Sequence, residues 1–247
     1  MCVSMHSLAA HELVEVWERG EGKHPIDKAL LCLAAAWPEQ PWEALAESSV
    51  GRRNDLLLAL HQLTFGPRLE GFAECPQCGE RLEFALDIAD LRAVGTEEGT
   101  PTPLLADGVE IVFRLPDSRD LAAMVACDDV PTARDRLVHR CVVQARRGKD
   151  EIAPETLPAE ATAVLAERLA ACDPLADIRL ELGCPACEHR WPLALDPVTF
   201  LWVRIAERAT HLLREVHTLA WAYGWREADI LAMSARRRQC YMDMVAG

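Results

Sequence analysis

The sequence has no long hydrophobic run. Although half of its 247 residues are hydrophobic, no stretch approaches the roughly 20 consecutive apolar residues that a transmembrane helix requires. Residues 1–6 also lack the positively charged start and the apolar stretch of a secretory signal peptide. We therefore expect a cytoplasmic protein with no membrane span.

Positive charge is also scarce. The chain has 26 Lys and Arg residues against 39 Asp and Glu residues, which gives a net charge of -13. A surface this acidic repels phosphate backbones, so we expect no nucleic-acid partner unless a basic patch is segregated. The only dense basic cluster is Arg236, Arg237 and Arg238. We expect these three on a solvated helix face, where they could meet an acidic partner.

Familiar catalytic motifs are missing as well. The chain has no Gly-rich phosphate loop, no His-Glu-x-x-His and no nucleophile elbow. His211 and His217 are six residues apart, which does not place them on one helix face. Helix capping is a sufficient explanation for Asp117 and Asp120. The sequence therefore favours a protein that is not an enzyme and has no small-molecule substrate.

Cysteine, by contrast, is plentiful, with ten residues. A chain of this length with an apolar core does not need a disulfide scaffold, so we expect reduced thiols. Most of the scattered cysteines occupy apolar helical positions, where a free Cys behaves as a small hydrophobe. These scattered residues are Cys2, Cys32, Cys127, Cys141, Cys172 and Cys240.

The remaining four cysteines form two matched knuckles, Cys-Pro-Gln-Cys at 75–78 and Cys-Pro-Ala-Cys at 184–187. Over the 17 positions that start at each knuckle, seven are identical, and each copy continues into an alternating strand that ends in Ala-Leu-Asp. Two such pairs supply the four thiolates of a closed tetrahedral zinc site. We therefore expect one Zn²⁺ ion, which would close a loop of over a hundred residues. Its predicted ligands are Cys75, Cys78, Cys184 and Cys187.

Other chemistries could use the same cysteines. A rubredoxin-type iron site has the same ligand set, so the sequence leaves zinc and iron open. A thiol oxidoreductase would need a low-pKa Cys at a helix start, whereas each pair here lies between predicted strands. His189 could replace one ligand, but its counterpart in the first copy is Glu80. That difference favours a surface or supporting role for His189.

The spacing of apolar residues predicts an α+β fold that is mainly helical. We expect a helical N-terminal region at 1–66 and a strand-plus-helices insertion at 93–174. A central zinc ribbon should be built from two sequence-distant β-hairpins, at 67–92 and 175–197. A long C-terminal helical arm should follow at 198–247.

Composition gives finer predictions within the insertion. Gly, Thr, Pro and acidic residues predict a loop at 94–107, and a strand should follow at 109–115. The next helix should begin at Asp117 or Ser118 as its N-cap. Two further helices are expected, near 131–146 and 158–171.

Aromatic residues crowd the predicted arm. Trp202, Trp221, Tyr223 and Trp225 lie on or just after its long helix, upstream of the arginine cluster at 236–238. Because Trp, Tyr and Arg are enriched in interface hot spots, these residues are candidates for a partner-binding surface. The alternative is that the aromatic residues simply pack the long helix against the body.

Several segments together resemble one known family. In these segments the sequence is similar to baseplate hub or assembly proteins of contractile-tailed phages, which also occur in gene clusters of phage-tail-like contractile injection systems. The similarity covers most of residues 50–245. The segments that carry it are Gly51–Leu57, Thr64–Gly66, Phe113–Leu121, Glu215–Trp225, Ile230–Leu231, Arg236–Arg238 and the two cysteine knuckles.

The resemblance implies a non-enzymatic, zinc-ribbon-containing component that is built into a baseplate or helps it to assemble. Its partners would be other baseplate, hub or spike proteins of the phage-tail-like particle. The residues alone leave another option, a zinc-ribbon adaptor of some other complex such as a nucleic-acid machine. The acidic charge balance disfavours that alternative.

Overall fold

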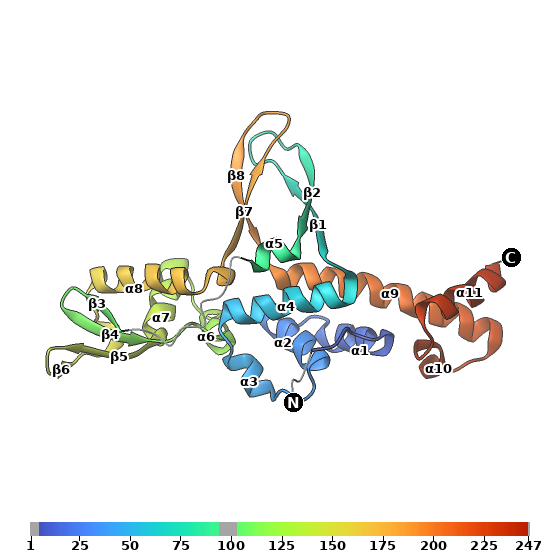
Figure 1. The fold of residues 1–247 in the computed structure, drawn as a ribbon, viewed down its shortest axis with the longest axis horizontal. Helices are drawn as coiled ribbons and strands as arrows, with labels where there is room; N and C mark the ends of the chain where they lie inside the picture. The colour runs from blue at the N-terminus through green and yellow to red at the C-terminus, as the bar shows by residue number, and fades with distance from the viewer. Residues whose placement is uncertain (1–4, 94–102, 247) are drawn as a thin grey trace.

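The computed structural model describes residues 5–93 and 103–246, and the protein has the outline of a T (Figure 1). Helices form the crossbar, two β-hairpins rise from its middle, and the C-terminal helices lie at one end. The insertion between the hairpins occupies the other end. The central body contains the long helix α9 (Pro197–Tyr223) and four N-terminal helices. These are α1 (Ala10–Gly20), α2 (Pro25–Ala36), α3 (Trp42–Glu47) and α4 (Val50–Phe65).

Helix α9 connects the parts of the molecule. Its 27 residues span about 40 Å at 1.5 Å per residue. Along its length it packs on α1, α2 and α4 and contributes Leu201, Ile205 and Leu212 to their common core. The helix ends at Gly224, whose positive φ of 68° suits a residue without a Cβ atom. The short helices α10 (Glu227–Leu231) and α11 (Ala235–Ala246) then fold back on it.

Both predicted hairpins are present, and they rise side by side from the body (Figure 1). Each is a two-stranded antiparallel sheet, and every second side chain of each strand is partly or fully buried. Leu58 of α4 and Leu175 belong to the apolar cluster at the base of both hairpins. The strands are β1 (Arg68–Glu74), β2 (Arg81–Asp87), β7 (Ile178–Gly183) and β8 (Arg190–Leu195), and α5 (Ile88–Arg92) follows β2.

The insertion has a core of its own. A four-stranded sheet in the order β3-β4-β5-β6 packs with helices, and Phe113, Ile111 and Leu165 are fully buried between them. Its strands are β3 (Leu104–Ala106), β4 (Val109–Phe113), β5 (Val142–Arg147) and β6 (Asp150–Glu151). Its helices are α6 (Ser118–Met124), α7 (Val130–Cys141) and α8 (Ala159–Cys172), with 3₁₀ turns at Pro154–Thr156 and Pro174–Ala176.

The structure confirms the mainly helical α+β fold and corrects two details of the insertion. The helix expected to reach residue 146 ends at Cys141, because the β-branched segment from Val142 pairs with β4 as a strand. Part of the loop expected at 94–107 is strand β3, which reaches β4 through Asp107 and Gly108. Both of these residues have positive φ, as a two-residue Asp-Gly hairpin turn requires. Positions 94–102 of that predicted loop lie outside the described residues.

The start of α6 and the length and polarity of the helices can be compared with the predictions from sequence. Asp117 is the N-cap of α6, and its carboxylate accepts hydrogen bonds from the amides of Arg119 and Asp120. Among the helices at 5–93 and 103–246, none combines the length and the apolar character needed to cross a bilayer.

Candidate metal centre

The four knuckle cysteines lie in the two turns at the ends of the hairpins furthest from the body (Figure 1). In the first turn the amide of Cys75 donates to the carbonyl of Glu80, and the amide of Gly79 donates to the carbonyl of Cys75, both at 2.9 Å. The second turn repeats both bonds at the same length around Cys184. The sequence duplication therefore corresponds to two copies of one backbone conformation.

One position in each turn requires a left-handed backbone. Gly79 has φ of 76°, and its counterpart Glu188 has φ of 59°. Glycine adopts this conformation freely, whereas a residue with a Cβ atom is strained by it. The first turn therefore has the residue that the conformation favours, and the second carries a small strain at Glu188.

The sulfur atoms have the separations of a tetrahedral ligand set. All four Sγ atoms lie within 4.8 Å of one another. The Sγ atoms of Cys75 and Cys187 are 3.7 Å apart, and those of Cys78 and Cys184 are 3.6 Å apart. Metal–sulfur bonds of about 2.3 Å in a tetrahedron put the sulfurs about 3.8 Å apart. A disulfide needs only about 2.0 Å, so the donor set fits a four-coordinate metal ion better than a pair of disulfides.

The local electrostatics differ between the thiols. Burial would raise the pKa of Cys75, but the amides of Gln77 and Cys78 and the neighbouring thiols lower it to about 7. For Cys78 the amide of Glu80 lowers the pKa, but the other three thiols and burial prevail and raise it to about 12. Four negative sulfurs this close repel one another, and a bound cation relieves that repulsion.

The surroundings of the cysteines bear on the alternative chemistries. Each pair lies between two antiparallel strands rather than at a helix start, where a redox-active Cys is usually activated. The ring of His189 stacks on Trp191, with ring centroids 6.0 Å apart, and His189 lies outside the group of four converging donors. The first cysteine of each pair, Cys75 or Cys184, is buried, and Cys78 is exposed.

The repeated Ala-Leu-Asp ending also has a structural role. Asp87 caps α5 by accepting a hydrogen bond from the amide of Ala89. Asp196 caps α9 in the same way, accepting from the amides of Val198 and Thr199. Each copy of the duplication therefore ends by starting a helix of the body. An Asp between a strand pattern and a helical pattern is a signal that sequence reasoning could have used here.

The predicted partner-binding residues of the arm differ in what they contact. Trp202 packs over Gly20, and the ammonium of Lys28 lies 4.5 Å from its ring centroid. The rings of Tyr223 and Trp225 stack on each other at 4.5 Å, and both contact Tyr241 of α11 edge-on. These ring contacts lie within the arm, while Tyr223 itself is 39% exposed.

The arginine cluster is also divided. Arg236 and Arg237 are exposed, but Arg238 is only 2% exposed, so the expectation of a solvated face is wrong for Arg238. Its Nε donates to the buried carboxylate of Glu215 on α9 at 2.6 Å, and its Nη1 donates to the carbonyl of Met233. Trp221 is 87% exposed at the end of α9.

Sequence reasoning missed the polar joint between the body and the insertion. Two segments that carry the family resemblance meet there. The amide of Val50 donates to the carbonyl of Pro116, and the guanidinium of Arg53 donates to the hydroxyl of Ser118. Gly51 must lack a side chain, because a Cβ atom would lie 1.8 Å from a carboxylate oxygen of Asp173.

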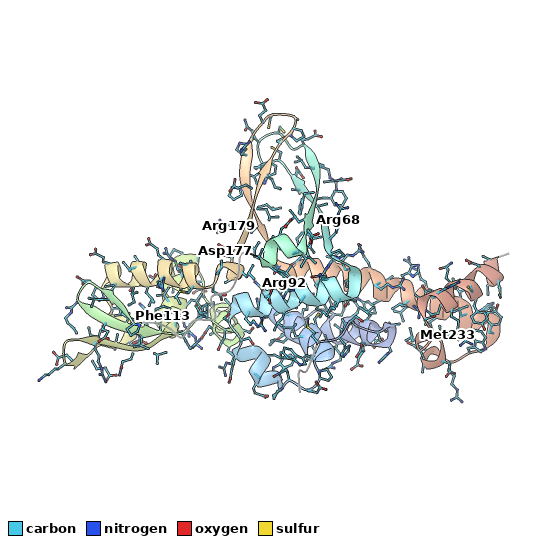
Figure 2. All side chains as sticks on the ribbon, viewed as in Figure 1. Arg68, Arg92, Phe113, Asp177, Arg179 and Met233 are labelled. Carbon is cyan, nitrogen blue, oxygen red and sulfur yellow. The ribbon has the colours of Figure 1, made fainter. Side chains whose placement is uncertain are left out.

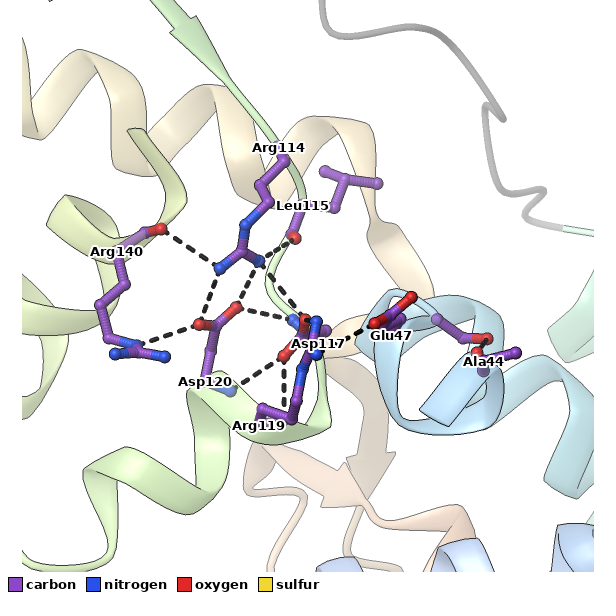
Figure 3. A network of polar contacts seen from close by, with 9 residues as sticks. Ala44, Glu47, Arg114, Leu115, Asp117, Arg119, Asp120 and Arg140 are labelled. Carbon is purple, nitrogen blue, oxygen red and sulfur yellow. Dashed lines mark hydrogen bonds and ion pairs between the residues drawn. The ribbon is translucent and has the colours of Figure 1, made fainter. Parts of the chain in front are cut away.

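A polar network within the insertion, next to this joint, is shown in Figure 3. The carboxylate of Asp120 has no solvent exposure and accepts hydrogen bonds from two guanidinium groups. Arg114 binds it with both Nη atoms, at 2.5 and 2.9 Å, and Arg140 binds it through Nε at 3.0 Å. Burial would raise the pKa of Asp120, but these hydrogen bonds and charges outweigh burial and lower it to about 2. Arg119 extends the network to Glu47 of α3.

The hairpins are joined to the body by a similar ion pair. Arg92 of α5 lies at the hairpin base (Figure 2), where its guanidinium binds the carboxylate of Asp55 on α4 through two nitrogen atoms. Asp55 is 7% exposed.

Comparison with known proteins gives one match. The family model described as "T4 bacteriophage base plate protein" matches residues 40–195. The matched region includes α4, both hairpins with all four cysteines, and the insertion, while α9, α10 and α11 lie wholly beyond it. No curated protein and no solved structure matches the chain.

Proposed function

The chain belongs to the family of T4 bacteriophage base plate proteins, and we propose that it is a structural or assembly component of the baseplate of a phage tail or a phage-tail-like contractile injection system. The observation that carries this proposal is the family match, which covers more than half of the chain. Its partners are other baseplate, hub or spike proteins, and it acts by protein–protein contacts within or on the tail particle.

The proposal includes a structural Zn²⁺ ion held by Cys75, Cys78, Cys184 and Cys187. The sulfur separations of 3.6 and 3.7 Å support it. When bound, the ion would fasten the tips of the two hairpins to each other. Since four protein thiolates fill every position of a tetrahedral site, no position remains for a substrate. This supports a scaffold that is not an enzyme, and it disfavours a thiol oxidoreductase.

The C-terminal arm is the proposed contact region for partners. Exposure supports Trp221, Arg236 and Arg237 as contact residues. Tyr223, which is 39% exposed, stacks on Trp225, and both rings contact Tyr241, over which the guanidinium of Arg237 lies. A zinc-ribbon adaptor for nucleic acid is the second candidate, but the net charge of -13 opposes it.

The function is tested in cells that carry the complete tail gene set. Deletion of the gene should yield tails without complete baseplates, and a tagged chain should fractionate with baseplate proteins. Normal tails after deletion, with no association of the tagged chain, would overturn the proposal. Elemental analysis of the purified protein should find about one zinc ion per chain, as a single four-thiolate site requires.

A further inference from the structure

A hollow of about 360 Å³ lies along α11. We call it the α11 groove, and its lining residues are Ser234, Arg236, Arg237, Cys240, Tyr241 and Met244. The buried contact of Arg238 with Glu215 holds the helix on α9. This contact leaves Arg236, Arg237 and Cys240 exposed. All six lining residues belong to α11 or directly precede it, so the groove is a feature of the exposed face of this helix.

The charge of the groove is opposite to that of the whole chain. The lining of the groove contains Arg236 and Arg237 and no acidic residue, while the chain as a whole has a net charge of -13. Within the part of the chain that the structure describes, neither Arg236 nor Arg237 forms a salt bridge. The guanidinium of Arg237 lies over the ring of Tyr241 at 5.8 Å. Both guanidinium groups are therefore available to donate hydrogen bonds to a carboxylate of a binding partner.

Apolar surface lies beside these charges. Met244 is 69% exposed and Val245 is 38% exposed, on the helix that also carries Tyr241. Flexible Met side chains adapt to the shape of a binding partner, and Tyr, Met and Arg are enriched in protein interfaces. The groove therefore combines a basic rim with an apolar side.

We propose that the α11 groove binds a segment of another baseplate protein, one that offers a carboxylate to Arg236 and Arg237 and an apolar side chain to Tyr241 and Met244. The inference rests on the proposed baseplate function, whose partner chemistry it specifies. Charge complementarity argues for this occupant, because an acidic segment is attracted to this part of an otherwise acidic molecule. Two copies of this chain repel each other through their net charge, which disfavours self-association.

The test uses the full-length protein in cells that produce the complete tail particle. Cys240 is replaced by the photo-cross-linking amino acid p-benzoylphenylalanine, and cross-linked peptides are identified by mass spectrometry. We expect a cross-link to a segment of a different baseplate protein that has acidic residues beside an apolar one. Adding R236E and R237E should lower the cross-linking yield about tenfold or more, because both charge-assisted contacts become repulsive. The matched control is R214E, a charge reversal at an exposed position of α9.

Four results would overturn the inference: a cross-link to a second copy of this chain, a neutral or basic target segment, no cross-link, or an unchanged yield in the R236E/R237E variant. Circular dichroism of that variant shows whether the arm is still helical. If the wild-type chain fractionates with baseplate proteins but the cross-linking gives one of these four results, the groove proposal is wrong and the proposed baseplate function stands. If the wild-type chain does not associate with the tail at all, the proposed function itself falls.

Discussion

The residue at the left-handed position of each cysteine turn determines how much backbone strain that turn carries. The left-handed position is occupied by Gly79 in one turn and by Glu188 in the other. A Cβ atom at Gly79 would meet only a carboxylate oxygen of Glu74 at 3.8 Å, an ordinary contact. The two turns therefore differ in backbone strain and not in available space.

This difference in strain predicts that two substitutions have opposite effects on the stability of the turns. Glu188→Gly should stabilise the second turn by about 0.5–1 kcal/mol, because it removes the strain of a left-handed non-glycine residue. Gly79→Glu should destabilise the first turn by about 1–2 kcal/mol for the same reason. The rate of metal release to a chromogenic chelator measures both changes. Equal release rates for the two variants would contradict this account of the turns.

A buried carboxylate is the second feature at the residue scale. Removing the charge of Asp120 leaves two arginines without their shared partner. We expect Asp120→Asn to lower the free energy of unfolding of the insertion by about 3 kcal/mol, near the low end for a broken buried pair. The low value is expected because Arg114 and Arg140 are 39% and 41% exposed and can be hydrated. Asp177→Asn, which breaks an exposed pair with Arg179, should cost about 0–1 kcal/mol.

The same residue predicts a pH dependence. The pKa of Asp120 is about 2 in the folded state, against an ordinary value of 3.8. Because the folded-state value is depressed, the stabilisation is fully present above about pH 4 and is lost as the pH falls towards 2. Thermal melts of the wild-type protein across this window should show the loss, and Asp120→Asn should lack this component. An identical pH profile for both proteins would contradict the assignment.

At the scale of elements, a buried ion pair and the packing of Tyr241 and Met242 on the main core hold α11 on α9. Arg238→Met should loosen α11 and cost about 1–3 kcal/mol locally, because the buried carboxylate of Glu215 loses its partner at 2.6 Å and keeps only His211 at 2.9 Å and Arg208 at 3.8 Å. Hydrogen exchange of residues 235–246 measures the loosening, and Arg236→Met at an exposed position is the control. Combining Glu215→Leu with Arg238→Met should restore most of the protection, since an apolar pair can replace a buried ion pair. Failure of the double variant to recover would point to packing instead of charge.

At the scale of the whole molecule, the metal centre lies at the hairpin tips and the main helical core lies in the body (Figure 1). The hairpin bases already pack on α4 through Leu58 and on each other. The bound ion would therefore constrain the free ends of the two hairpins, although its ligands are a hundred residues apart in sequence. Metal loss should therefore loosen the hairpins and leave the rest of the chain folded.

Metal removal tests this expectation. Cys75→Ser, or a strong chelator, should abolish zinc binding and increase hydrogen exchange in 68–87 and 178–195. The helical signal in circular dichroism should remain nearly unchanged, because the helical body has its own core. Cys184→Ser should behave like Cys75→Ser, and Cys240→Ser, outside the cluster, should behave like the wild-type protein. Cooperative loss of the helical signal in the Cys75→Ser variant would show that the centre supports the whole fold.

Local patterns in the sequence determined the hairpins, the cysteine pairs and most helices, because alternation, helical spacing and capping residues act over a few positions. The two Cys-Pro-x-Cys pairs also identified the four thiols that could bind one metal ion. The tertiary structure decided what depends on distant partners. Arg238 is buried because Glu215 faces it from another helix, and β5 is a strand because β4 lies beside it. The sulfurs converge because the bases of two distant hairpins pack on one helix, and no local pattern encodes that contact.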